Sequence, residues 1–287
     1  MKIGILGPEH MAMTWEKHLR SVSDVHEVVI APKLRLLRNL DACLILSNTT
    51  LHSESTEYVL EALKHGYHIL WIAPPPLKTV DVNRWYEASE EAGVTVMFAM
   101  WPHYSPATRW LCNHITNPEK IIIHREWPGP KFTPDPHALH RIILEELSLC
   151  LEWAQKRVVK LEGDLDLSQS HNNPASATKQ LHIQFAGKTS ASIHLIPYGL
   201  ENRHSRFVTG EHMAAVCQIN DQMIKKWLFH GKESHTPELM HFDYREPARL
   251  LISHFIRSIR TEGKPLYGIV ELQKLVSFLD RFSDTNQ

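Results

Sequence analysis

The stretch that decides the fold is Asp41-Ala-Cys-Leu-Ile-Leu46, a short apolar run behind one acidic residue. Strands that are buried on both faces of a parallel sheet have this continuous apolar pattern, because helices cover both of their faces. A helical pattern follows over Ser53–His65 and ends at Gly66, and a second apolar run begins at His68. The stretch therefore predicts a strand–helix–strand unit of a doubly wound parallel sheet.

The same alternation extends over the first hundred residues and changes after Pro106. The predicted strands of the first part are Lys2–Leu6, Glu27–Ile30, Ala42–Leu46, His68–Ile72 and Thr95–Met100, and its helices are Met11–Arg20, Ser53–His65 and Val80–Ala92. Later strands alternate polar and apolar residues, as in an antiparallel sheet: Lys120–Glu126, Leu181–Phe185, Ser190–Pro197, Arg206–Thr209 and Ala214–Asn220. Helices are predicted over Ala107–Ile115, His140–Gln155, Ala248–Ile259 and Val270–Phe282.

These patterns predict an α/β protein of two domains. Residues 1–105 form an abridged Rossmann-like domain, and residues 106–287 form an α/β domain with a mostly antiparallel open sheet. The last two helices are expected to pack back on the first domain. A chain of 287 residues suits this organisation, since domains commonly have about 100–200 residues.

Composition excludes several classes of protein. The chain has 31 basic and 32 acidic side chains, so its net charge of −1 argues against a general nucleic-acid binder. It has no run of about 18 apolar residues, so we expect no membrane span. The four cysteines lie far apart without a C-x-x-C pair, which is typical of a cytoplasmic protein with reduced thiols.

Three local patterns, in order, resemble the glucose–fructose oxidoreductase / inositol dehydrogenase / MocA (Gfo/Idh/MocA) family. Residues Asp41–His52 resemble the family's D-A-V-x-I-x-T-P-x-x-x-H turn, and His68–Pro74 is similar to H-V-x-x-E-K-P. Gly93–Pro106 is similar to G-V-x-L-M-V-G-x-x-x-R-F-x-P. The resemblance implies an NAD- or NADP-binding Rossmann domain, a second domain whose open sheet serves oligomerisation, and oxidation or reduction of sugars, polyols and related small molecules.

The nucleotide-binding turn departs from this pattern. A dinucleotide fingerprint needs G-x-G-x-x-G, in which the second glycine lets the backbone approach the pyrophosphate. Here Gly7 and Ala12 fit, but Glu9 occupies the second position, and Pro8 removes a backbone donor. We expect a vestigial cofactor site, and its positions are Gly7, Glu9, His10, Asn48 and His52. Alternatively, Glu9 turns outward and the site stays usable, and His52 only caps a turn.

The second strand is followed by a gap. It ends at Ile30-Ala-Pro-Lys33 without the carboxylate that usually holds the ribose hydroxyls, although Lys33 or Arg35 could favour a 2′-phosphate. Only residues 31 to 40 separate it from Asp41 and the next buried strand. A full strand–helix unit with its crossover needs about 30 residues. A helix and a strand are therefore predicted to be missing where the adenosine would rest.

The catalytic positions implied by the resemblance also differ. Ala73 stands where the family's E-K-P lysine is expected to assist proton transfer. The family usually carries an aspartate and, four residues later, a histidine on the helix that faces the cofactor. An alignment of the family's helix on Glu145 puts Leu149 at the histidine position, and an alignment on Trp153 puts Glu146 there. Neither alignment supplies the histidine.

Other polar residues remain candidates for the cleft between the domains. The side chains that could contact a ligand there are those of His103, His137, His140, Glu145 and Glu146. Two histidines with a carboxylate form a legitimate metal-ligand set, but no H-E-x-x-H or similar motif is present, and no metal site is assigned.

Three functions stay open at this point. The favoured hypothesis is a degenerate oxidoreductase-like protein that uses no nicotinamide cofactor and acts as a binding, regulatory or partner subunit. The second is an atypical NAD- or NADP-dependent oxidoreductase on a sugar, polyol or similar molecule, and the third is a metal-dependent enzyme in the same cleft. We expect a homodimer or a related subunit to associate through the C-terminal sheet, a possible small-molecule ligand in the interdomain cleft, and no nucleic acid or membrane.

Overall fold

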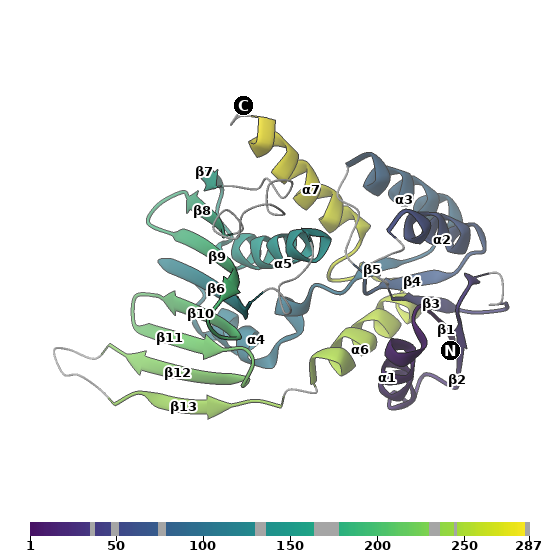
Figure 1. The fold of residues 1–287 in the computed structure, drawn as a ribbon, viewed down its shortest axis with the longest axis horizontal. Helices are drawn as coiled ribbons and strands as arrows, with labels where there is room; N and C mark the ends of the chain where they lie inside the picture. Colours follow the sequence, from purple (N-terminus) through teal and green to yellow (C-terminus); the bar gives the residue numbers. More distant parts are fainter. Residues whose placement is uncertain are drawn as a thin grey trace. The chain divides into compact units, whose positions relative to one another are not determined.

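A computed structural model of the chain describes residues 1–34, 38–46, 52–73, 79–129, 136–163, 178–229, 236–243 and 246–284. The chain divides into two compact units (Figure 1). The first contains residues 1–100 together with 247–285, and the second contains residues 101–246. Residues 101–105 thus belong to the second unit and not, as the sequence predicts, to the end of the first domain.

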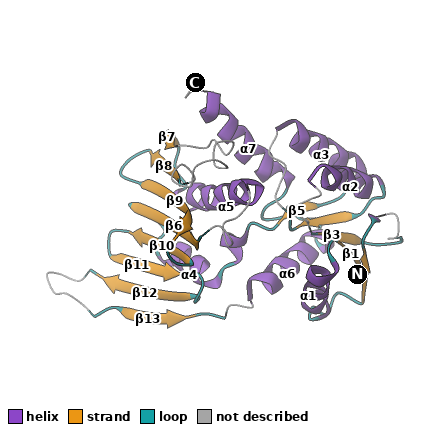
Figure 2. Ribbon diagram, viewed as in Figure 1, coloured by secondary structure: helices purple, strands orange, loops and turns teal. Residues whose placement is uncertain are grey.

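The first unit is built on a five-stranded parallel sheet with the order β2-β1-β3-β4-β5 (Figure 1), and its strands are orange in Figure 2. Its strands are β1 (Lys2–Leu6), β2 (Glu27–Ala31), β3 (Ala42–Ile45), β4 (His68–Trp71) and β5 (Val96–Phe98). Its helices are α1 (Glu9–Arg20), α2 (His52–Lys64), α3 (Thr79–Ala92), α6 (Glu246–Arg260) and α7 (Ile269–Asp284). All four residues of β3 are buried, as expected of a central parallel strand.

This sheet has fewer strands than the usual dinucleotide-binding sheet, as the sequence predicts. The usual dinucleotide-binding order, 3-2-1-4-5-6, has one more strand outside the second strand. Here β2 is the edge strand, and the chain crosses from β2 to β3 without an α-helix among described residues 32–34 and 38–41. The carboxylate of Asp41 accepts a hydrogen bond of 2.6 Å from the backbone N–H of Lys2 and so fixes the start of β1.

The last two helices belong to the first unit rather than to a separate second domain. The backbone N–H of Phe98 donates to the carbonyl of Tyr267, and Met97 forms an isolated bridge with Gly268. The amide of Gln273 on α7 donates to Asn83 on α3 at 2.7 Å. These contacts tie the C-terminal helices to β5 and α3.

The second unit contains an eight-stranded sheet with the order β13-β12-β11-β10-β6-β9-β8-β7. Its strands are β6 (Lys120–Pro128), β7 (Val158–Gly163), β8 (Lys179–Phe185), β9 (Ser190–Gly199), β10 (Arg203–Thr209), β11 (Met213–Gln218), β12 (Met223–Leu228) and β13 (Glu238–His241). Only the β6–β9 pair is parallel. The helical elements are the 3-10 helix η2 (Trp101–Tyr104), α4 (Pro106–His114) and α5 (Pro136–Ala154).

Three strands of this sheet, β7, β12 and β13, were not predicted. They lie at or next to the sheet edges, and β12 carries the consecutive residues Lys225 and Lys226, which interrupt any apolar alternation. Charged residues are common on such strands because they discourage pairing with other chains. Helix α5 begins at Pro136, four residues before the predicted start at His140, since proline is well suited to a first helical turn.

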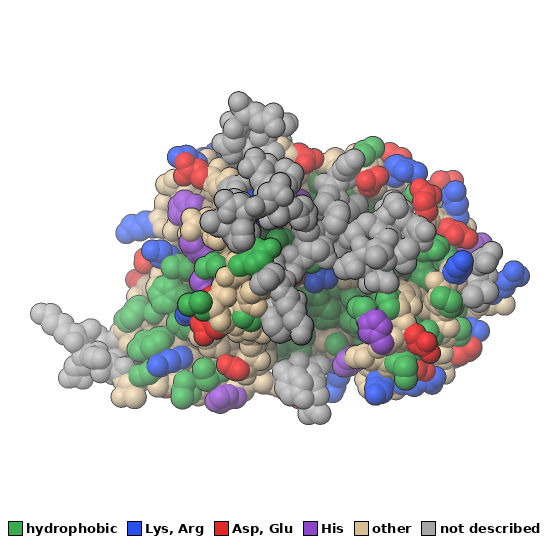
Figure 3. Space-filling view, viewed as in Figure 1, with side chains coloured by type: hydrophobic (Ala, Val, Ile, Leu, Met, Phe, Trp, Pro, Cys, Tyr) green, Lys and Arg blue, Asp and Glu red, His purple; other side chains and the backbone are tan. Residues whose placement is uncertain are grey.

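The surface agrees with the balanced composition. On the face drawn in Figure 3, the described acidic and basic side chains are interspersed. Among the described residues, no helix is both long enough and apolar enough to cross a membrane.

Candidate functional site

The turn after β1 keeps its glycine for a packing reason. A Cβ atom at Gly7 would lie 2.5 Å from the Cβ atom of Leu46 and 3.0 Å from its carbonyl oxygen. The two segments approach this closely because the backbone N–H of Leu46 donates to the carbonyl of Leu6 at 2.8 Å. Gly7 is therefore explained by the contact between the ends of β1 and β3, together with its φ angle of +153°, which residues with a side chain rarely adopt.

The two residues after this turn begin α1. Pro8 occupies the N-cap without a side-chain hydrogen bond, and Glu9 and His10 are exposed in the first turn. A carboxylate in this position is favourable for the helix, because the unpaired N–H groups give the N-terminus partial positive charge. Glu9 thus has a structural role at the position where a dinucleotide fingerprint has glycine.

The remaining positions of the expected nucleotide site are only partly described. Asn48 and the side chain of His52 lie outside the described residues. Ala73 lies two residues after the end of β4 and is buried, with 5% of its surface exposed. A methyl group can neither donate nor accept a proton, so this end of β4 has no acid or base at residue 73.

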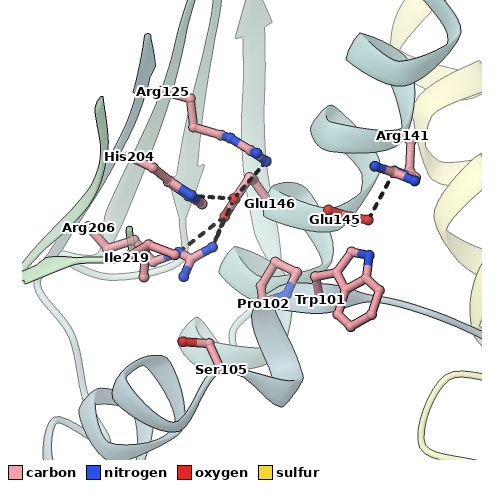
Figure 4. Close-up of a pocket in the computed structure, with 10 residues that line it drawn as sticks. All are labelled: Trp101, Pro102, Ser105, Arg125, Arg141, Glu145, Glu146, His204, Arg206 and Ile219. Carbon is pink, nitrogen blue, oxygen red and sulfur yellow. Dashed lines mark hydrogen bonds and ion pairs between the residues drawn. The ribbon is translucent and has the colours of Figure 1, made fainter. Parts of the chain in front are cut away.

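The second unit holds a charged cavity of about 210 Å³ (Figure 4). Helix α5 contributes Arg141, Glu145 and Glu146, β6 contributes Arg125, and β10 contributes His204 and Arg206; Trp101, Pro102, Ser105 and Ile219 complete its lining. The two glutamates that the sequence identified are therefore brought into one site, and the three arginines around them were not predicted to be part of it.

Glu146 is the centre of a buried ion cluster. Its carboxylate accepts hydrogen bonds from Arg206 Nη2 at 2.8 and 2.9 Å and from Arg206 Nε at 3.2 Å. His204 Nε2 lies 3.1 Å from Glu146 Oε1, and Arg125 Nη1 lies 3.7 Å from the same oxygen. Burial by itself would raise the pKa of Glu146, but the Arg206 charge and the His204 hydrogen bond hold that pKa well below its usual range. Glu146 is therefore ionised at neutral pH.

His204 stays neutral beside this carboxylate. Burial, followed by the positive charge of Arg125, lowers the pKa of His204 to about 3. An ionised carboxylate only accepts hydrogen bonds, so the Nε2 atom of the neutral ring carries the proton that it donates to Glu146.

Glu145 has the opposite protonation behaviour. Its side chain is 2% exposed, and burial raises its pKa to about 7 against the opposing charges of Arg141 and Arg125. Arg141 Nε lies 3.3 Å from Glu145 Oε1, an ion-pair contact, but that oxygen has no hydrogen-bond partner among the described residues. A buried carboxyl that titrates near neutral pH is a candidate acid–base group.

The candidate His103 does not join the two glutamates. His103, in η2, is buried against Ser148, with 2.9 Å between its Nε2 and the hydroxyl oxygen, and lines a different cavity of about 300 Å³ with Glu152 and Cys112. Its pKa is lowered to about 3, chiefly by burial. His140 is half-buried on α5, and the side chain of His137 lies outside the described residues. Within the described part of the chain, no group of three histidine, cysteine or acidic side chains is placed to hold a metal ion.

A local signal for the arginine cluster exists in the sequence. Arg206 lies two residues before Val208, so both side chains lie on the same face of β10, and Val208 is fully buried. An arginine on a buried strand face requires an acidic partner. The sequence does not say which acidic residue this is, because Glu146 lies 60 residues away.

The fold has close structural relatives at low sequence identity. UDP-N-acetylglucosamine 3-dehydrogenase GnnA from Acidithiobacillus ferrooxidans is 15% identical, with a TM-score of 0.77, over 98% of this chain and 96% of that one. The dehydrogenase MviM from Clostridium difficile is 14% identical, with a TM-score of 0.82, over 99% of each chain. An NAD-binding oxidoreductase from Klebsiella pneumoniae is 13% identical, with a TM-score of 0.74, over 100% of this chain and 97% of that one.

No family model and no curated protein sequence matches the chain. At these identities the structural likeness establishes the fold. The structural neighbours are dehydrogenases of the Gfo/Idh/MocA type, and the chain has their fold over nearly its whole length.

Proposed function

We propose that this chain is an oxidoreductase-like protein that does not catalyse with NAD or NADP. It acts as a binding, regulatory or partner subunit, and its ligand site is the charged cavity of the second unit. The observation that carries this proposal is the edge of the first sheet. β2 is the outermost strand, and no further strand pairs with its outer edge among the described residues, where the usual fold supports the adenosine.

Two further observations support the same proposal. Glu9 brings a carboxylate to the first turn of α1, where a pyrophosphate would otherwise meet free N–H groups. Ala73 leaves the end of β4 without a proton donor. Each change weakens a different part of nicotinamide chemistry, namely cofactor affinity and proton transfer.

The test is titration of the full chain with NADH and with NADPH, in which binding is measured by calorimetry and by the fluorescence of the cofactor. We expect no saturable binding at micromolar concentration of either cofactor. Micromolar affinity for one of them, or hydride transfer to any sugar-like substrate, would overturn the proposal. The Klebsiella pneumoniae oxidoreductase that binds NAD is a suitable positive control for both measurements.

A second candidate function is an atypical NAD- or NADP-dependent oxidoreductase on a sugar or polyol. The pKa of Glu145, about 7, favours it, because such a carboxyl can exchange a proton with a bound hydroxyl at neutral pH. Turnover of a polyol panel with either cofactor, lost in Glu145→Gln and kept in Glu152→Gln, would support this function over the first.

We infer in addition that a second copy or a related subunit covers the outer face of the second sheet. Ile122, Phe207 and Val216 lie side by side on β6, β10 and β11 and remain partly exposed. An open sheet with such an apolar row gains free energy when a partner buries it. Light scattering at micromolar concentration is expected to give at least a dimer, and a monomeric mass contradicts the inference.

A further inference from the structure

The cavity of the second unit has more positive than negative charge. Its lining includes three guanidinium groups, on Arg125, Arg141 and Arg206, and two carboxyl groups. With both carboxyl groups ionised, one positive charge is in excess, and with Glu145 protonated there are two. A small buried site with excess positive charge is a site for an anion.

The three arginines are not equally available to a ligand. Arg206 is 1% exposed and is held by Glu146 through two nitrogens and by the hydroxyl of Thr108. The side chains of Arg125 and Arg141 are 21% and 27% exposed, so both are more accessible from the cavity than Arg206. In Figure 4 these two arginines lie on either side of the glutamate pair.

An oxygen of Glu145 that receives no hydrogen bond is a second, independent sign of a ligand. A buried polar atom without a hydrogen-bond partner is costly, and such atoms are expected where a ligand or a proton completes the site. Glu145 Oε1 is buried in the lining of this cavity and has no such partner among the described residues.

We propose that this cavity binds a small anion through Arg125 and Arg141, a carboxylate or a phosphate group, and that Glu145 takes up a proton as the anion binds. The inference rests on the proposed function, because it takes the cavity as the ligand site. The volume of about 210 Å³ suits a ligand of few atoms or the anionic end of a larger one.

The uptake of a proton by Glu145 follows from the charged groups that surround its carboxyl group. These are Arg141 and Glu146 on its own helix, Arg125 on β6 and Arg206 on β10, while His204 remains neutral because its pKa is about 3. Glu146 stays ionised, so Glu145 is the group in this cluster that titrates near pH 7. An anion beside Arg141 adds negative charge next to Glu145, weakens its stabilisation by the arginine and favours its protonated form.

The experiment is calorimetric titration of the full chain with sulfate and with oxalate, at pH 6, 7 and 8. Sulfate represents the tetrahedral phosphate group and oxalate the planar carboxylate, and neither probe changes charge in this range. With a free-protein pKa of about 7, linkage predicts roughly tenfold weaker binding at pH 8 than at pH 6. Repeating each titration in buffers of different ionisation enthalpy measures proton uptake, expected at roughly half a proton per anion at pH 7.

Three variants assign the effect to individual residues. Arg125→Met is expected to weaken binding at least tenfold, and Arg125→Lys, which keeps the charge, is expected to recover part of it. Glu145→Gln is expected to keep binding while losing both the pH dependence and the proton uptake. Glu152→Gln is the matched control, since Glu152 lies on the same helix but lines the other cavity, and it is expected to behave as the unchanged protein.

The outcomes separate this inference from the proposed function. The inference is overturned if neither anion binds at millimolar concentration, if Arg125→Met binds as tightly as the unchanged protein, or if Glu145→Gln keeps the proton uptake. The absence of cofactor use is overturned separately, by micromolar binding of NADH or NADPH. A preference for sulfate over oxalate, or the reverse, identifies the phosphate or the carboxylate as the anion that the cavity recognises.

Discussion

The nucleotide-type turn of the first unit and the charged cavity of the second unit differ in what their polar groups do. At the turn, Gly7 serves the contact with Leu46, Glu9 lies exposed at the start of a helix, and Ala73 has no polar side-chain atom. In the cavity, Glu145 and Glu146 are buried among arginines, and their pKa values move in opposite directions. Structural needs account for the residues of the turn, whereas the cavity keeps buried charge that packing alone would not require.

The largest expected effect tests whether the cavity depends on its ion cluster. Arg206→Met removes the main partner of the fully buried Glu146 and leaves that carboxylate with one cation, Arg125 at 3.7 Å, and the neutral His204. We expect a loss of about 3–5 kcal/mol in the free energy of unfolding, measured by urea denaturation. The double variant Arg206→Met/Glu146→Leu is expected to recover much of this loss. If the single variant is as stable as the unchanged protein, the cluster does not hold the second unit together.

The next effect concerns the pH dependence of stability. The pKa of Glu145 is raised in the folded chain from its usual value of 4.5 to about 7, so the folded state binds more protons than the unfolded state between these values. The stability contributed by this protonation is complete below about pH 4.5 and is lost as the pH rises through 7. In Glu145→Gln this loss is absent, so its stability relative to the unchanged protein is expected to rise by about 3 kcal/mol over that window. Urea denaturation at several pH values measures it, and a constant difference would contradict the raised pKa.

A smaller effect is expected at the turn of the first unit. Gly7→Ala introduces a methyl group 2.5 Å from the Cβ atom of Leu46, and we expect a loss of about 1–3 kcal/mol in the free energy of unfolding. Gly66→Ala is the matched control, since Gly66 has a φ angle of +72° but no atom within 4 Å of an added Cβ. It should lose only the conformational cost, about 1 kcal/mol. Equal losses in both variants would argue against the packing explanation of Gly7.

The smallest effect is expected when the turn is returned to the fingerprint. Like charges about 4 Å apart at an effective dielectric constant of about 20 repel by roughly 4 kcal/mol, so Glu9 would oppose a pyrophosphate strongly. Removing it still leaves β2 as the edge strand, and the affinity of Glu9→Gly for NADH and NADPH is therefore expected to stay weaker than micromolar. The double variant Glu9→Gly/Ala73→Lys is expected to show no turnover. Micromolar cofactor binding by Glu9→Gly would show that one carboxylate, and not the missing strand, separates this turn from a working site.

The fold of the first unit could be predicted almost completely from the sequence. Parallel strands such as β3 are buried on both faces, so a short apolar run between helical patterns is sufficient to identify them. The edge strand β13 of the second unit and its neighbour β12 could not be predicted, because they carry glutamate and lysine and have no apolar alternation.

The candidate site was only half predictable. The sequence pointed to Glu145 and Glu146, since both lie on the helix that the family resemblance implied. Arg125 and Arg206 lie on the neighbouring strands β6 and β10. In the register of these two strands, Arg125 lies opposite His204, and Arg206 lies opposite Ile123. That register is set by hydrogen bonds between strands about 80 residues apart, which no local pattern encodes.

The sequence by itself determined which chemical groups are available: no lysine at residue 73, a carboxylate at residue 9 and two consecutive glutamates on one helix. Only the tertiary structure decided what the two glutamates do. Neighbouring residues on a helix project about 100° apart, so Glu146 meets Arg206 and His204 while Glu145 meets Arg141 and a buried space. The pKa of a carboxyl depends on burial and on charges a few ångströms away in space, and identical residues in adjacent positions therefore acquire different protonation states.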